Sequence, residues 1–175
     1  MSLAIQAPAA PFTLPDTDGT PTPLHDGHSA ATVVVFTCNH CPYALAWHDR
    51  LQTVARDYED RGVLFLQVNP NDAERHPRDS PEAMKARTDA GEFAGPYLHD
   101  PTQEVARAWG ATVTPDVYVL DADARIAYHG APDGDHRDES LAAAWLREAL
   151  DDVLAGRPVA RAETPPRGCS IKWRG

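Results

Sequence analysis

Two cysteines three positions apart are the residues of this sequence best suited to chemistry. Cys38 ends the apolar run 32–37, and Cys41 stands directly before Pro42. The run predicts a buried strand and the segment after it predicts a helix, so the pair lies where a helix presents its unpaired N–H groups. The partial positive charge there favours a thiolate, and we expect the pKa of Cys38 to fall from about 8.5 to about 7 or below. The two-residue spacer then lets Cys41 attack a mixed disulfide formed at Cys38.

Asn39 and His40 separate the two cysteines. We assign both residues to tuning the thiol pKa or positioning substrate, because a protonated imidazole beside a thiol favours the thiolate. The alternative for His40 is a surface histidine that tunes nothing.

A CxxC pair also occurs as half of a zinc site, whose other half is a second CxxC or a pair of histidines. The sequence has no second CxxC. We therefore expect no resident metal and no cofactor. The open alternative is a Cu(I) or zinc ion held by Cys38, His40 and Cys41, with Cys169 or a distant histidine.

Composition and charge restrict the partners. The 175-residue chain has a net charge of -10 and three cysteines, too few for a disulfide framework. Its negative charge disfavours binding to nucleic acid or to an anionic membrane surface, since both repel it. The N-terminus lacks the pattern of a signal peptide, and no apolar run approaches a membrane span. We expect a cytoplasmic protein, in which a disulfide would be transient and catalytic.

The pattern of elements predicts an α/β fold with a mixed sheet. A short hairpin is expected near 12–19, and strands at 32–37 and 63–68 joined by a helix form a right-handed βαβ unit. Helices are expected to begin at Ser80-Pro81 and at Asp100, the latter with a capping box completed by Gln103 and an end at Gly110. A hairpin at 117–128 and a helix over 139–155 complete the predicted domain, 1–156, and 157–175 forms a C-terminal tail.

Three further features have ordinary structural interpretations. Thr114-Pro115 precedes a predicted strand, where base rates favour a trans bond. His48 shares the apolar stripe of its helix and is interpreted as a core histidine. The acidic stretch 133–136 is interpreted as a solvated loop.

Several segments together resemble a known family. The opening, 10–19, is similar to that of the redoxin family, which includes alkyl hydroperoxide reductase/thiol-specific antioxidant proteins. The segments 36–43, 69–72, 114–116 and 168–173 resemble one bacterial branch of thioredoxin-like redoxins, of which CNHCP and the C-terminal GCSIKW are the specific motifs. The resemblance covers nearly the whole chain.

The resemblance implies a thioredoxin-like fold: a central mixed sheet flanked by helices, with an N-terminal β-hairpin and an extended C-terminal tail. It also implies that Cys38 is the attacking cysteine and Cys41 the resolving one. Pro115 then falls where such proteins keep a cis-proline beside the disulfide, and Thr114 would offer a backbone edge to a substrate peptide.

Three positions depart from the patterns of related families. Thr32 stands where thioredoxin has a buried aspartate, so the proton acceptor for Cys41 is unassigned. Ala31 and Val35 stand where peroxiredoxins have the proline and threonine that activate peroxide.

Cys169 has two interpretations. It is either a third redox thiol, exchanging with Cys38 or Cys41 when the tail folds back, or a small apolar residue that anchors the tail beside Ile171 and Trp173. We favour the anchoring role.

The sequence therefore predicts a thiol-disulfide oxidoreductase that uses a Cys38/Cys41 couple. It would reduce disulfides of proteins or small molecules and draw on an unidentified electron donor. Thiol peroxidase activity is the alternative enzyme function.

Overall fold

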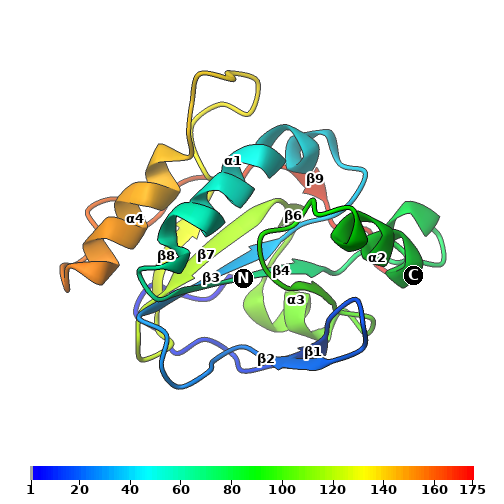
Figure 1. The fold of residues 1–175 in the computed structure, drawn as a ribbon, viewed down its shortest axis with the longest axis horizontal. Helices are drawn as coiled ribbons and strands as arrows, with labels where there is room; N and C mark the ends of the chain where they lie inside the picture. The colour runs from blue at the N-terminus through cyan, green and yellow to red at the C-terminus, as the bar shows by residue number, and fades with distance from the viewer. Residues whose placement is uncertain (1) are drawn as a thin grey trace.

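A five-stranded mixed sheet forms the centre of the molecule (Figure 1). The computed structural model describes residues 2–175. The strand order is β5-β4-β3-β7-β8, in which β4 runs parallel to β3 and β5, while β7 runs antiparallel to β3 and β8. The strands are β3 (Ala31–Phe36), β4 (Val63–Asn69), β5 (Tyr97–His99), β7 (Asp116–Leu120) and β8 (Ile126–Gly130).

The central strand β3 is apolar on both faces because each face is covered. Val33 and Val35 pack on the side of α1 (Pro42–Glu59) and α4 (Ala144–Leu154). Val34 and Phe36 point the other way, into the core that includes α3 (Glu104–Trp109) and the N-terminal segment. Alternate side chains of a strand point to opposite faces, so one unbroken apolar run serves both cores.

Two small sheets complete the fold. The antiparallel hairpin of β1 (Thr13–Pro15) and β2 (Pro21–Pro23) confirms the one predicted near the N-terminus. The second pairs β6 (Val113–Thr114) with β9 (Cys169–Ser170) and so joins the tail to the domain. A 3-10 turn, η1 (Pro77–Asp79), and α2 (Pro81–Asp89) lie between β4 and β5.

The helix predicted from Asp100 begins later than expected. Gln103 has a positive φ of 64° and precedes α3, so the predicted capping box does not form. Its side-chain amide instead donates to the carbonyl oxygens of Pro70 and Lys172, which keeps Gln103 out of the helix. The Asp100 carboxylate accepts a hydrogen bond from the Ala106 N–H.

The last helix is also shorter than predicted: α4 begins at residue 144 rather than at 139. The buried carboxylate of Asp133 accepts the N–H of Ala143, the residue before the helix, and also bonds Trp47 and Arg50 on α1. The interpretation of 133–136 as a solvated loop is therefore wrong for Asp133. His48, interpreted as a core histidine, is only partly buried, and its ring bonds the Glu92 carbonyl.

No helix within residues 2–175 combines the length and apolarity needed to span a membrane.

Candidate active site

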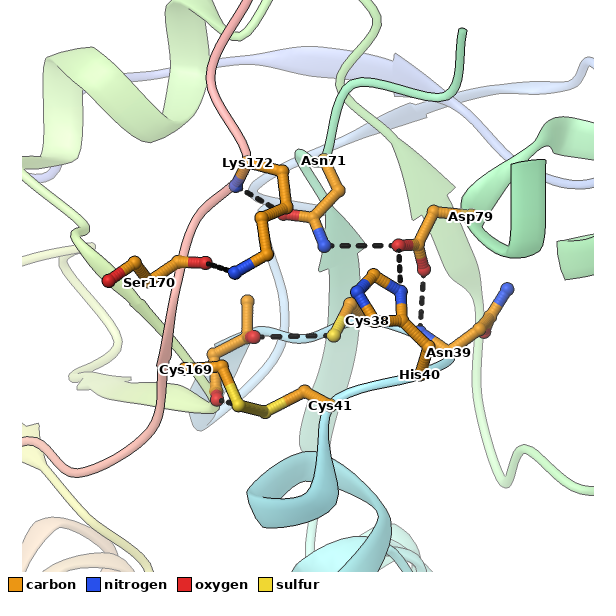
Figure 2. Close-up of a disulfide and its surroundings, with 10 residues drawn as sticks. Cys38, Asn39, His40, Cys41, Asn71, Asp79, Cys169, Ser170 and Lys172 are labelled. Atoms are coloured by element: carbon orange, nitrogen blue, oxygen red, sulfur yellow. Dashed lines mark hydrogen bonds and ion pairs between the residues drawn. A yellow bond between two sulfur atoms is a disulfide. The ribbon is translucent and has the colours of Figure 1, made fainter. Parts of the chain in front are cut away.

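The two cysteines of the CxxC turn lie where β3 passes into α1 (Figure 2). Cys38 follows the end of β3 by two residues, and Cys41 is the residue immediately before the first turn of α1. Both side chains are buried. The parallel pairing of β3 with β4 and the start of α1 at Pro42 fix the backbone on either side of the turn.

The disulfide of the structure joins Cys41 to Cys169, and Cys38 is a free thiol. The sequence predicted a couple between Cys38 and Cys41, and that pair is not the one bonded here. The physical reason is the pairing of β9 with β6, which sets Cys169 opposite Thr114 and brings its Cα within 6.1 Å of that of Cys41. The favoured interpretation of Cys169 as an apolar anchor alone is therefore wrong.

Thr114 is the residue on which both sulfurs converge. Its Oγ1 lies 3.3 Å from Cys38 Sγ, and its carbonyl oxygen lies 3.2 Å from Cys41 Sγ. The peptide bond from Thr114 to Pro115 is cis, as the family resemblance implied. The strand start that looked ordinary by base rate thus forms one wall of the site.

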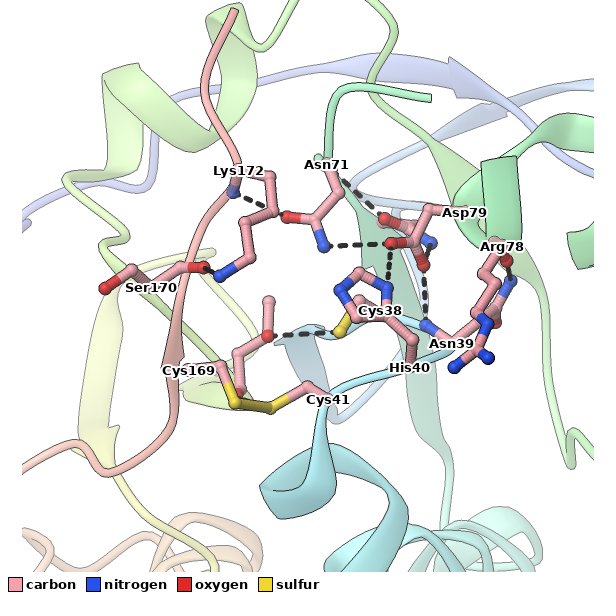
Figure 3. Close-up of polar contacts among 12 residues, drawn as sticks. Cys38, Asn39, His40, Cys41, Asn71, Arg78, Asp79, Cys169, Ser170 and Lys172 are labelled. Atoms are coloured by element: carbon pink, nitrogen blue, oxygen red, sulfur yellow. Dashed lines mark hydrogen bonds and ion pairs between the residues drawn. A yellow bond between two sulfur atoms is a disulfide. The ribbon is translucent and has the colours of Figure 1, made fainter. Parts of the chain in front are cut away.

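Asp79, at the end of η1, holds the CxxC turn from the other side (Figure 3). It is fully buried, and its Oδ1 accepts the Asn39 N–H at 2.7 Å and the Asn69 amide at 3.0 Å. Its Oδ2 accepts the Asn71 amide at 3.1 Å and lies 2.6 Å from His40 Nδ1. The carboxylate therefore fixes both residues between the cysteines.

Asn39 and His40, predicted to tune or position, each have further partners. The Asn39 side-chain oxygen accepts from Arg87 and from the Tyr97 hydroxyl, and its amide donates to the Arg78 carbonyl. The His40 ring stacks on His76, with ring centres 5.5 Å apart. These contacts hold His40 against the loop that follows β4, and Asn39 against that loop, α2 and β5.

Sequence reasoning missed Asp79 because it lies in 69–80, a polar and proline-containing segment whose composition indicates a surface loop. The available signal was the pair of asparagines at the end of β4, since buried amide donors need acceptors nearby. Asn69 and Asn71 both donate to Asp79. A buried acid thus lies near Cys38 on a turn, and not on the strand where thioredoxin carries one.

The family follows from a match along most of the chain. A model of the AhpC/TSA family matches residues 5–129. This chain belongs to the AhpC/TSA family. The resemblance noted in the sequence is thereby confirmed.

Relatives of this AhpC/TSA chain agree with the assignment. Proteins named "Putative peroxiredoxin" in two strains of Mycobacterium tuberculosis are 34% identical over 111 residues, which cover 61% of this chain and 62% of theirs. The match thus spans less than two thirds of the length of these relatives.

Solved structures show the fold. An uncharacterized conserved protein from Geobacillus kaustophilus is 41% identical, with a TM-score of 0.91 over 98% of this chain and 93% of its own. The thioredoxin domain of a thiol-disulfide oxidoreductase from Bacteroides vulgatus is 18% identical, with a TM-score of 0.64 over 77% of this chain and 93% of its own. The AhpC/TSA chain has a thioredoxin-like α/β fold, as predicted.

The pKa of the Cys38 thiol is raised rather than lowered, contrary to expectation. Burial is the main cause, and the negative charge of Asp79 adds to it, while the Thr114 hydroxyl and backbone N–H groups act in the opposite direction. In the state with Cys41 bonded to Cys169, Cys38 is a protonated thiol kept away from solvent. The charge at the start of α1 is outweighed by desolvation.

A metal ion bound in this AhpC/TSA site would compete with hydrogen-bond donors for the oxygens of Asp79. One donor atom each from Cys38, His40 and Asp79 lies within 4.8 Å of the others, so Asp79 takes the place expected for Cys41 in the predicted set. A carboxylate has about four lone-pair directions. Those of Asp79 are already used by three N–H donors and His40. The arrangement suits a hydrogen-bonded support for the turn better than a metal centre.

Proposed function

We propose that the protein is a thiol-disulfide oxidoreductase in which Cys38 attacks and Cys41 resolves. The observation that carries the proposal is the convergence of a free Cys38 and the Cys41–Cys169 disulfide on Thr114, beside the cis bond to Pro115. A thiol and a disulfide held against one residue are the two reactants of an exchange. Membership of the AhpC/TSA family supports thiol-based redox chemistry at this site.

The reaction begins from the form in which all three cysteines are reduced. Cys38 loses its proton and its thiolate sulfur bonds one sulfur of the substrate disulfide, while the other substrate sulfur leaves as a thiolate. The Cys41 thiolate then bonds Cys38 Sγ, and the substrate sulfur that was bonded to Cys38 leaves as a thiolate. The substrate gains two electrons and two protons, and the protein retains one disulfide.

Asp79 and Asn39 position the reacting groups. The turn must hold its shape while its two sulfurs exchange partners, and the bond from the Asn39 N–H to Asp79 fixes it at its centre. His40, held 2.6 Å from Asp79, supplies a cationic group beside the thiols when protonated. Asp79, Asn39 and His40 have positioning roles, since none of the three bonds the substrate sulfur.

The proposed substrates are disulfides of proteins or small molecules, with an electron donor of dithiol chemistry that restores the reduced form. A cytoplasmic setting, expected from the sequence, would favour the reducing direction.

Single serine variants of the three cysteines test the proposal in an insulin-reduction assay with dithiothreitol as donor. We expect Cys38→Ser to lower the rate by about 100-fold or more, because the nucleophile is lost. Cys41→Ser should accumulate a mixed disulfide at Cys38, visible by mass spectrometry. A Cys38→Ser protein that reduces insulin at the wild-type rate would refute the mechanism.

Thiol peroxidase activity is the second candidate, supported by family membership and by one contact. The proline and threonine positions of peroxiredoxins hold Ala31 and Val35, both buried in β3. A hydroxyl nevertheless reaches Cys38 from another element, through Thr114 Oγ1 at 3.3 Å.

Trapping of a sulfenate at Cys38 with dimedone after micromolar peroxide distinguishes the two activities. Rapid sulfenate trapping in the wild type that the Thr114→Val substitution abolishes would support the peroxidase. If no sulfenate is trapped while the protein still reduces insulin, the reductase alone is supported.

A further inference from the structure

The segment that carries Cys169 is anchored by a buried residue at each end. We call residues 165–170 the strap. On one side, Thr164 is buried, with its hydroxyl bonded to Ala131 N–H and to the Tyr128 hydroxyl. On the other side, Ile171 is buried and its N–H donates to the Thr112 carbonyl. The strap itself is exposed or half-buried throughout.

Beyond Ile171 the attachment continues. The Lys172 N–H donates to Asn71, and its carbonyl oxygen accepts from the Asp72 N–H and the Gln103 amide. Figure 2 shows the Lys172–Asn71 hydrogen bond on the chain that runs on from Cys169. Breaking the disulfide would therefore free only the strap, and Cys169 would stay near Cys41 at an effective concentration on the order of mM.

The strap lies on the site as an extended peptide would. Residues 169–170 pair antiparallel with β6, so that Cys169 is opposite Thr114 and Ser170 opposite Val113. At the same time the Cys169 sulfur is bonded to Cys41. A strand added to an exposed edge, with its cysteine in a disulfide to the CxxC turn, shows how a disulfide-bonded peptide can lie on this edge, here through Cys41 rather than through the attacking Cys38.

Gly168 makes this fit selective. A Cβ atom at this position would overlap the Thr114 carbonyl oxygen and carbon, and would approach Pro115 N at 3.1 Å. Backbone atoms cannot move aside as a flexible side chain can. The residue before the cysteine must therefore be glycine for the chain to come this close to β6.

Resting on the proposed function, we propose that the strap is an internal substrate that takes over the disulfide and closes the β6 edge, and that this edge accepts extended peptides with glycine before their cysteine. After a substrate is reduced, the Cys169 thiolate bonds Cys41 Sγ, the Cys38–Cys41 bond breaks, and Cys38 leaves as a thiolate that takes up a proton. One disulfide replaces another, so no external oxidant or reductant is consumed. The reverse exchange frees the strap and opens the edge.

The docking half of the proposal is tested on the full chain with Cys38→Ser and Cys169→Ser, which leaves Cys41 as the sole thiol. The probes are peptides of residues 165–171, each activated as a mixed disulfide with thionitrobenzoate: the natural sequence, its Gly168→Val form, and its Ser170→Ala form as a matched control.

We expect the natural and Ser170→Ala peptides to bond Cys41 about ten-fold faster than the Gly168→Val peptide, and all three to react alike with Cys41 in urea. Hydrogen exchange at Val113 and Thr114 should slow only when the glycine peptides are attached. Equal rates for the three peptides on the folded chain would overturn the docking site. This test involves no Cys38, so it is independent of the proposed reductase mechanism.

The exchange half is tested on the otherwise native chain by acid quenching, alkylation and peptide mapping of the disulfides. Gly168→Val should shift the ratio of Cys41–Cys169 to Cys38–Cys41 bonds by about ten-fold toward the latter, and Ser170→Ala should leave it unchanged. A Gly168→Val chain with the wild-type ratio would refute the strap as the controlling element. Loss of insulin reduction with this shift intact would refute only the reductase function.

Discussion

In two aspartate–histidine pairs of the molecule, the aspartate is buried and the separation is the same, but the surroundings differ. His40 Nδ1 lies 2.6 Å from Asp79, and His129 Nε2 lies 2.6 Å from Asp116. Asp79 also accepts three N–H donors, two from asparagine side chains and one from the backbone of the CxxC turn. Asp116 bonds only the His129 ring among the described side-chain contacts, and that ring stacks on Tyr118 with centres 4.2 Å apart.

The difference teaches that burial alone does not decide what a carboxylate does. The donors around Asp79 replace the water that a carboxylate loses on burial, so a negative charge can stay beside Cys38 and act on its pKa. Asp116 lacks such a set, and burial raises its pKa even though His129 acts against the change. One pair lies beside Cys38, and the other lies next to the cis bond.

The largest effect is expected from Asp79→Asn. The new NH₂ group must face either the Asn39 N–H and the Asn69 amide or the Asn71 amide, all of which donate to the carboxylate. An unsatisfied buried donor costs about 1–3 kcal/mol in the free energy of unfolding, measured by urea denaturation. Misplacement of the turn should lower kcat/KM for insulin reduction by about ten-fold or more. Wild-type values for both quantities would show that the two pairs are equivalent.

The pH dependence of Cys38 alkylation sharpens the same contrast. Because the Cys38 pKa is raised above 9.0 in the Cys41–Cys169 form, the rate with iodoacetamide should rise about ten-fold per pH unit through pH 8 without levelling off below pH 9. Removing the charge of Asp79 should move this profile to lower pH, while Asp116→Asn should leave it in place. A wild-type plateau near pH 7 would contradict the raised pKa.

A smaller effect is expected from Asp116→Asn. An amide has nearly the shape of a protonated carboxyl and can still accept from His129, so the free energy of unfolding should fall by less than about 1 kcal/mol. Since the Asp116 pKa is raised above 3.8, its contribution to stability is complete below pH 3.8 and declines as the pH rises through the folded-state value. The wild type should therefore lose stability relative to the variant over that range. A variant that loses more stability than Asp79→Asn would reverse the comparison.

The smallest effect is the coupling between the pairs. Asp79 and Asp116 share no hydrogen-bond partner. The double variant should therefore be additive within about 0.5 kcal/mol in the free energy of unfolding. A larger coupling, measured by the double-mutant cycle, would mean that the two pairs act as one network through Thr114 and Pro115.

Sequence patterns predicted those helices and strands whose own residues favour them strongly. The buried strands, the βαβ unit and the helix after Pro42 follow from apolar runs and helix-start residues. The starts of α3 and α4 do not, because Gln103 and Ala143 are held by partners distant in sequence, Lys172 and Asp133. The three-residue strand β5 is too short to leave a pattern.

The candidate site likewise has parts that the sequence predicts and parts that it does not. The CxxC turn and Thr114-Pro115 are recognisable in the sequence, and the structure brings them together. The bond from Cys41 to Cys169 joins residues 128 positions apart. It depends on a β pairing of only two residues, and the position of Asp79 depends on a loop whose shape comes from its hydrogen bonds. The two-residue β pairing has no local signature, and the local signal for Asp79 is limited to Asn69 and Asn71.

The segment just before the strap also affects whether molecules associate with one another. Residues 162–164 run along β8, an outer strand of the central sheet, and exchange backbone hydrogen bonds with His129. An uncovered outer strand is a template for pairing with another chain. A chain cut after Arg161 would lose this cover together with Cys169, and would tend to aggregate. One cut after Thr164 would keep this cover but lose Cys169 together with the attachment through Ile171 and Lys172, so the cover of β8 and the redox part of the tail are separable by a few residues.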